Sequence, residues 1–194
     1  MLAPSFYFYL LAALLATGFH AILAHQTQTE RWKVKTVMDA DSSSVDFTNP
    51  MESSVRTQAT MPQIHVHANT PRQSEERTLI RVHAYLLSVK LEADGDYHLI
   101  IQDNLTRATM LAEIPDPDAA GVRSSSHATA YRNARTLIES VAGLPNSDMH
   151  YLAKPIKMII TGVGFFDESH IEAQEGNDAN CRELHPVVSI EVIP

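Results

Sequence analysis

Two pairs of acidic and imidazole side chains bracket one loop near the C-terminus of this 194-residue chain. Asp167 and His170 precede the loop, Glu183 and His185 follow it, and 14 residues separate the two histidines. Carboxylate oxygens and imidazole nitrogens are ligands of Zn²⁺ and Mn²⁺, so these four residues are candidates for a divalent metal site. The structural alternative is that His185 donates a hydrogen bond that orders the loop. We therefore predict no obligatory cofactor and keep a divalent metal as the alternative.

A second candidate pair of binding residues lies upstream, on two predicted strands. Apolar residues alternate through segment 97–102, which turns His98 away from the predicted core. Glu113, in the next predicted strand, could pair with His98 or with Arg81. An exposed His98 beside Asp96 could bind a ligand on an open face of the sheet. The structural alternative is that His98 is an ordinary solvated strand residue.

The elements that must position these side chains begin at residue 77. Segment 77–92 is rich in β-forming residues, and its apolar parity changes at Leu86–Leu87, which predicts a β-bulge. Asp94–Gly95 predicts a hairpin turn. Further strands are predicted at residues 97–102, 108–114, 157–166 and 183–193. Apolar residues that recur at helical spacing from Ala130 to Val141 predict one helix, with Gly143 at its end.

This order of elements, β-β-β-α-β-β, is typical of an OB-like five-stranded barrel, so we predict a mostly β fold with one helix. Closing such a barrel requires the first strand to pair with two neighbours, which explains its length and its change of parity. Gly162 and Gly164 share one face of a predicted strand and permit a close approach there. The alternative is an open α+β sandwich with the helix packed on an antiparallel sheet. In either case the domain spans residues 77–194.

The first 76 residues are predicted to hold an export signal and an arm. An uncharged apolar run that begins at Phe6 precedes Glu30, the first charged residue, which predicts a signal peptide over residues 1–24. The alternative is an uncleaved anchor, because the run is nearly long enough to span a bilayer. Residues 25–76 carry few large apolar side chains and are predicted to form an extended N-terminal arm, with one short strand at 32–36. The mature chain would be periplasmic or extracellular.

The charge and the cysteine content narrow the function. A net charge of -8 makes nucleic acid an unlikely partner. Cys181 is the only cysteine, which excludes an intramolecular disulfide and a cysteine-based zinc site. We expect an exported small binding or structural module rather than an enzyme, with an exported ligand or a cell-envelope component as partner and membrane contact only if the N-terminal segment is uncleaved. The alternative is a metal-dependent hydrolase or nuclease-like OB domain that uses the acidic and histidine residues of the last two strands.

Four segments together resemble a group of uncharacterised exported bacterial proteins. These segments are DYHLII (96–101), TMLAEIPDP (109–117), TGVGFFD (161–167) and ELHPV (183–187). The resemblance covers most of residues 31–193 and implies a bacterial, exported, OB-like domain without implying an established activity. Such proteins often carry a cysteine directly after Pro-Asp-Pro, where this chain has Asp118. A weaker similarity, of Asp94-Gly-Asp96 and Pro-Asp-Pro, is to staphylococcal-type nucleases, but the spacing of Arg107 does not fit their arginine and carboxylate site.

Overall fold

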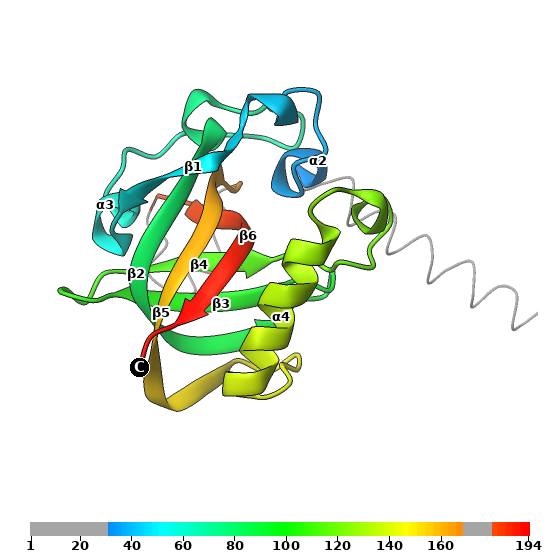
Figure 1. Ribbon diagram of the computed structural model, residues 1–194. Coiled ribbons are helices and arrows are strands. Elements are labelled where there is room, and N and C mark those ends of the chain that lie inside the picture. The colour runs from blue at the N-terminus through cyan, green and yellow to red at the C-terminus, as the bar shows by residue number, and fades with distance from the viewer. Residues whose placement is uncertain (1–30, 169–179) are drawn as a thin grey trace, which may run out of the picture.

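The structure is a computed structural model that describes residues 31–168 and 180–194, and its fold is mostly β (Figure 1). Its strands are β1 (Asp46–Ser53), β2 (Thr78–Leu91), β3 (Tyr97–Asp103), β4 (Thr109–Ile114), β5 (His150–Phe166) and β6 (Arg182–Val192). They form one six-stranded sheet in the order β1-β2-β3-β4-β6-β5, and β2 also pairs with β5. The predicted mostly β class is therefore confirmed.

The predicted number of five strands is wrong, because β1 adds a sixth strand from within the predicted arm. β1 pairs in parallel with β2, from Asp46 beside Thr78 to Ser53 beside Val82. The residues of β1 do not alternate between buried and exposed, so the strand lacks the period-two pattern that identifies a strand in a sequence. From Thr78 onward the chain continues through β2, β3, β4, the helix α4 (Ala128–Ala142), β5 and β6.

β2 is the strand that joins the two sides of the sheet. It pairs antiparallel with β3 and with β5, and both pairings shift register between Leu86 and Ser88. The predicted bulge at the parity change is thus confirmed. Ile80, Val82 and Leu86 are buried before the bulge and Val89 is buried after it, so the shift returns apolar side chains to the same core.

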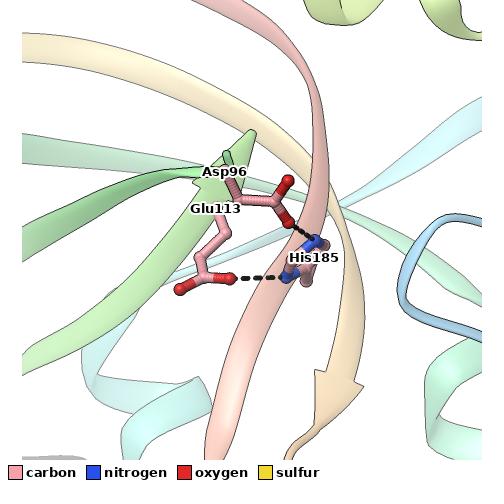
Figure 2. A group of neighbouring side chains, drawn as sticks. All are labelled: Asp96, Glu113 and His185. Atoms are coloured by element: carbon pink, nitrogen blue, oxygen red, sulfur yellow. Dashed lines mark ion pairs between the residues drawn. The ribbon is translucent and has the colours of Figure 1, made fainter. Parts of the chain in front are cut away.

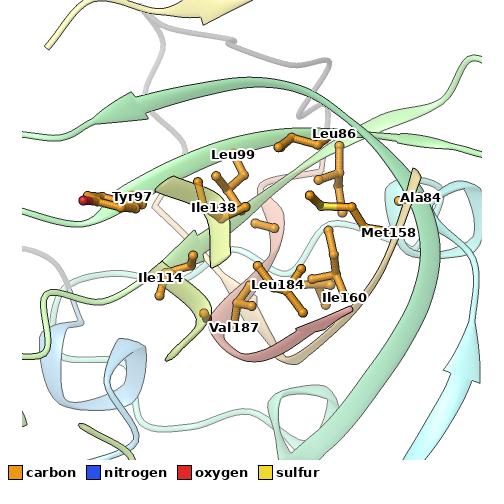
Figure 3. Close-up of a cluster of buried hydrophobic side chains, with 14 of the residues drawn as sticks. Ala84, Leu86, Tyr97, Leu99, Ile114, Ile138, Met158, Ile160, Leu184 and Val187 are labelled. Atoms are coloured by element: carbon orange, nitrogen blue, oxygen red, sulfur yellow. The ribbon is translucent and has the colours of Figure 1, made fainter. Parts of the chain in front are cut away.

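The helix α4 supplies one side of that core. Tyr131, Ala134 and Ile138 are buried, whereas Leu137 is only partly buried against the cluster. Gly143 ends the helix with a φ of 83°, a conformation that favours glycine, as the sequence predicted. Figure 3 shows Ile138 among strand residues such as Leu99, Met158 and Leu184, which also belong to the main hydrophobic core.

At the start of β6 the side chain of Arg182 packs closely against Gly164 of β5. A Cβ atom at Gly164 would collide with the guanidinium group of Arg182, which is fully buried and lies over the ring of Phe166. A Cβ atom at Gly162 would lie 3.0 Å from the carbonyl oxygen of Pro186. Both glycines therefore lie where neighbouring groups approach the backbone closely, as their spacing in the sequence indicated.

The N-terminal arm is more structured than the sequence predicts. It contains the helices α2 (Trp32–Lys35) and α3 (Val55–Ala59) and the 3₁₀ turns η1 (Ser42–Ser44) and η2 (Ser74–Arg77). The short strand predicted at 32–36 is wrong, because these residues form α2. Val55 joins the main core, while Val37 and Val45 pack with Leu79 and Val163 in a second cluster.

A buried ion pair fastens the arm to the sheet. The guanidinium of Arg31 makes two bonds to the Glu76 carboxylate, of 2.6 and 2.7 Å. Both side chains also bond the backbone of Phe166 at the end of β5. Arg31 donates to the Phe166 carbonyl oxygen at 2.7 Å, and the Phe166 N–H donates to the Glu76 carboxylate at 2.8 Å. Polar anchoring of this kind explains how a segment with few large apolar residues still packs closely.

Candidate functional site

Seven polar residues gather on the face of the sheet that points away from the main core, which we call the outer face. They form what we call the acidic–imidazole cluster: Lys35, Asp94, Asp96, His98, Glu113, Glu183 and His185. Asp96 and His185 are fully buried, and His98, Glu113 and Glu183 are at least nine-tenths buried. These residues come from α2, from the β2–β3 turn and from strands β3, β4 and β6. Segments distant in sequence therefore meet at one buried polar site.

Strand alternation explains why the strand residues of the cluster share the outer face. In β6, Leu184 belongs to the main core, so its neighbours Glu183 and His185 point to the opposite side. A register shift between Leu184 and Val187 then returns Val187 to the core. In β4 the flanking residues of Glu113 are core residues in the same way, and β3 places His98 directly opposite Glu113. The parallel pairing of β4 with β6 then places Glu113 beside the two β6 residues.

The turn between β2 and β3 places Asp94 and Asp96 in the cluster. Gly95 adopts a φ of 94°, which favours glycine and permits the tight turn that the sequence predicted. Asp96 accepts a hydrogen bond of 2.8 Å at Oδ1 from the backbone N–H of Asp116, which fixes its carboxylate. Its other oxygen, Oδ2, faces the cluster.

The imidazole of His185 lies between two carboxylates (Figure 2). Its Nδ1 is 3.0 Å from Glu113 Oε2, and its Nε2 is 3.4 Å from Asp96 Oδ2. Although these atoms are close, within the described residues neither imidazole nitrogen has a partner in good hydrogen-bond geometry, and neither does Asp96 Oδ2. The second carboxylate oxygen of Glu113, Oε1, lies 2.7 Å from Nδ1 of His98. Glu113 therefore links the two histidines.

Lys35 brings a positive charge into the cluster from α2. Its ammonium nitrogen lies 3.2 Å from Asp94 Oδ2, 3.2 Å from Glu113 Oε2 and 3.8 Å from Asp96 Oδ2. An ammonium group is a compact cation with three donors, and here three carboxylates surround it. The site thus already binds one cation, which belongs to the chain itself.

These neighbours move the pKa values of the cluster in opposite directions. Burial by itself would raise the pKa of Glu113, but Lys35 and the two histidines outweigh burial and hold that pKa well below its usual value. Burial and the nearby charge of Glu113 raise the pKa of Glu183 to about 8. Burial and Lys35 oppose the charged form of His185, yet Asp96, Glu113 and Glu183 raise its pKa well above the ordinary value.

His98 shows the same balance. Burial would lower its pKa, but the hydrogen bond and the charge of Glu113 raise the pKa above the ordinary value. At neutral pH the cluster therefore combines ionised Glu113, protonated His185 and a largely uncharged Glu183. One buried glutamic acid thus holds a proton while its neighbour is ionised.

The structure brings together four of the six residues that the sequence singled out. Glu183 and His185 meet His98 and Glu113, and of the two partners that the sequence offered for Glu113 the structure shows His98. The prediction that His98 is exposed is wrong, because only 6% of it is accessible. His98 is buried by the other residues of the cluster, and no pattern in the sequence around His98 predicts that contact.

Asp167, a fifth predicted residue, influences the cluster through its charge. The negative charge of Asp167 acts on Glu183, while the Asp167 backbone N–H donates to the Cys181 carbonyl oxygen at 2.9 Å. His170 lies outside the described residues. The sequence also missed Lys35, for which it offers no signal. It noted Asp96 beside His98 and the Asp94-Gly-Asp96 turn, but it did not predict that either aspartate meets Lys35 or His185.

Three of these residues are arranged as potential metal ligands. Asp96, Glu113 and His185 each offer one ligand atom, and these atoms lie within 4.8 Å of one another. Carboxylate and imidazole ligands in this combination suit Zn²⁺ or Mn²⁺. The arrangement can therefore bind a cation or exchange protons.

Comparison of the chain with protein-family models, with curated proteins and with solved structures finds no match. Within residues 31–168 and 180–194, every helix is too short or too polar to cross a bilayer. The predicted signal peptide at residues 1–24 lies outside the described residues.

Proposed function

We propose that the protein is a small exported module that binds a cationic ligand on the outer face of an OB-like barrel. Support for the barrel comes from the strand pairings, which run from β2 through β3, β4, β6 and β5 back to β2. OB folds usually bind their ligands on the face of their second and third strands and at the adjoining loops. The corresponding strands here are β3 and β4, which carry His98 and Glu113, and the adjoining β2–β3 turn carries Asp94 and Asp96.

The observation that carries the proposal is the position of Lys35. Its ammonium lies among the carboxylates of Asp94, Asp96 and Glu113, so the cluster accepts a positively charged group of this size. Carboxylates that face one another repel unless a cation lies between them. A ligand that carries the same kind of charge is therefore the one that this buried cluster favours.

The charge of the chain and its expected location support the same ligand class. A net charge of -8 disfavours nucleic acids and other polyanions. The apolar N-terminal run and the resemblance to exported bacterial proteins support a periplasmic or extracellular module. Its partner would then be an exported ligand or a component of the cell envelope.

A thermal-shift panel with named probes tests the proposal. The cationic probes are spermidine, a trilysine peptide, Zn²⁺, Mn²⁺ and Ca²⁺, and the anionic probes are heparin and single-stranded DNA. We expect at least one cationic probe to raise the Tm by roughly 5–10 °C when its concentration is about 100 times its Kd. The anionic probes should leave the Tm unchanged.

Matched variants make the panel specific to the cluster. Glu113→Gln should abolish the shift, because it removes a carboxylate that faces Lys35. Glu191→Gln removes a carboxylate on β6 whose side chain is 57% exposed, and it should keep the shift. A panel in which no cationic probe stabilises the protein, or in which only the anionic probes do, would overturn the proposal.

A metal-dependent hydrolase is the second candidate, and the state of Glu183 favours it. A carboxyl group with a pKa of about 8 exchanges its proton near neutral pH, as a general acid or base must. It lies 3.7 Å from His185 Nδ1, next to the potential metal ligands. Hydrolysis of a phosphodiester such as bis-p-nitrophenyl phosphate with Mn²⁺ would support this candidate if Glu183→Gln abolished it. Equal rates in the variant and the unaltered protein would reject it.

A further inference from the structure

The ligand class can be narrowed further, on the basis of the function just proposed. We infer that Asp96, Glu113 and His185 form a site for a divalent transition-metal ion, and that Lys35 competes with the ion for the same carboxylates. The chain would then hold its own replaceable cation on α2. A metal ion would take the place of the ammonium group.

The first observation is the convergence of the ligand atoms. Two ligands of a tetrahedral Zn²⁺ ion, each about 2.1 Å from the metal, lie about 3.4 Å apart. Asp96 Oδ2 and His185 Nε2 are separated by 3.4 Å. The widest separation in the set of three is within 4.8 Å, so the ligands need to draw together by no more than about 1.4 Å.

The second observation is independent of this convergence and concerns hydrogen bonding. His185 is fully buried, and among the described residues neither of its ring nitrogens meets a partner in good hydrogen-bond geometry. Asp96 is also fully buried, and among the described residues its Oδ2 atom has no partner in good hydrogen-bond geometry either. Buried polar atoms normally have partners, because a buried polar group without one loses the hydrogen bonds that it makes with water. A metal ion that replaces the proton on one His185 nitrogen would give that nitrogen and Asp96 Oδ2 a common partner.

The position of Lys35 makes the two cations mutually exclusive. Its ammonium lies 3.2 Å from Glu113 Oε2 and 3.8 Å from Asp96 Oδ2, beside two of the three ligand groups. A divalent ion within about 2.1 Å of the same oxygens would leave no room there for the ammonium. The lysine stem is long and flexible, and Asp94, 3.2 Å away and partly exposed, offers a partner to a displaced Lys35.

The chemistry of the donors sets the order of preference among metals. Imidazole nitrogen together with carboxylate oxygen suits Zn²⁺ and Mn²⁺, whereas Ca²⁺ takes six to eight oxygen ligands. We therefore expect Zn²⁺ to bind more tightly than Mn²⁺, and Ca²⁺ to bind least. This order is the one that the ligand set imposes.

Calorimetric titration of metal-free protein with Zn²⁺, Mn²⁺ and Ca²⁺ at pH 7.5 tests the inference. We expect Lys35→Met to bind Zn²⁺ about tenfold more tightly than the unaltered protein, because the variant has no ammonium group to be displaced from Glu113 and Asp96. Asp96→Asn and His185→Gln should abolish the binding of Zn²⁺. Lys154→Met, which removes an exposed lysine on β5, is the matched control and should leave the affinity unchanged.

A second measurement uses the unaltered protein, in case Lys35→Met does not fold. Reductive methylation of lysines, read by mass spectrometry, reports how accessible each ammonium is. Zn²⁺ should increase the labelling of Lys35 several-fold and leave that of Lys154 unchanged. Labelling of Lys35 that does not respond to bound Zn²⁺ would overturn the competition.

The outcomes separate this inference from the proposed function. No heat from any of the three metals, in the unaltered protein and in Lys35→Met, would overturn the metal site. The proposed function would still hold if spermidine or the trilysine peptide stabilised the protein through Glu113. Zn²⁺ binding that survives both Asp96→Asn and His185→Gln would place the ion elsewhere and would also overturn the inference.

Discussion

Replacement of Glu183 by glutamine should change how the stability of the protein depends on pH. The pKa of this buried carboxyl is raised from 4.5 to about 8, by burial first and by the charge of Glu113 second. A raised carboxyl pKa means that folding favours the protonated form. The stabilisation is therefore fully present below pH 4.5 and is lost as the pH rises through 8. Glutamine resembles the protonated carboxyl and does not titrate.

The expected magnitude follows from proton linkage. Between about pH 5 and pH 8 the unfolded chain has released this proton while the folded chain retains it, so the free energy of unfolding falls by about 1.4 kcal/mol per pH unit. Across that range the loss reaches roughly 4 kcal/mol. His185, whose pKa is also raised, adds to the loss at higher pH, as its unfolded form begins to lose its proton. The difference in the free energy of unfolding between the unaltered protein and Glu183→Gln, taken at each pH, isolates the contribution of Glu183.

Urea unfolding at pH 5, 6, 7 and 8 measures this difference. Trp32, the only tryptophan, packs against the main core and reports unfolding by fluorescence. Relative to the unaltered protein, Glu183→Gln should gain about 1.4 kcal/mol for each pH unit. Glu191→Gln, an exposed change on the same strand, should follow the unaltered protein at every pH. Parallel stability curves for the protein and Glu183→Gln would show that Glu183 is ionised in the fold, and the reasoning would fail.

Three further predictions concern the arm, the helix and export. Glu76→Gln should destabilise the protein by about 3–5 kcal/mol, because it leaves the charge of Arg31 buried without its counter-ion; Glu52→Gln, an exposed change, should cost almost nothing in the same urea titration. Ile138→Ala should cost about 2–5 kcal/mol in thermal unfolding followed by circular dichroism; an equal cost for Leu137→Ala, a partly buried neighbour, would contradict the packing of α4 described here. Mass spectrometry of exported protein should find a mature chain that begins near residue 25, and an intact N-terminus would favour the membrane anchor instead.

The sequence by itself determined the features that depend on local patterns. Alternation predicted the strands from residue 77 onward, and the parity change at Leu86–Leu87 predicted the bulge in β2. The turn at Gly95 and the end of α4 at Gly143 were equally local. The adjacent strands made His98 one of two possible partners of Glu113, and the structure shows that pair. These features are predictable because backbone geometry repeats with a period of two in strands and 3.6 in helices.

Only the tertiary structure decided how the arm packs and which residues complete the cluster. β1 joins β2 in parallel across a long connection, and α2 delivers Lys35 to Glu113 and to the aspartates of a distant turn. The contact of Asp96 with His185 likewise joins residues of β6 and the β2–β3 turn. A charged pair leaves no periodic trace along a chain, because its energy depends on distance and burial and not on sequence spacing. Lys35 and Asp96 therefore acquire their roles only when the arm and the sheet enclose the same carboxylates.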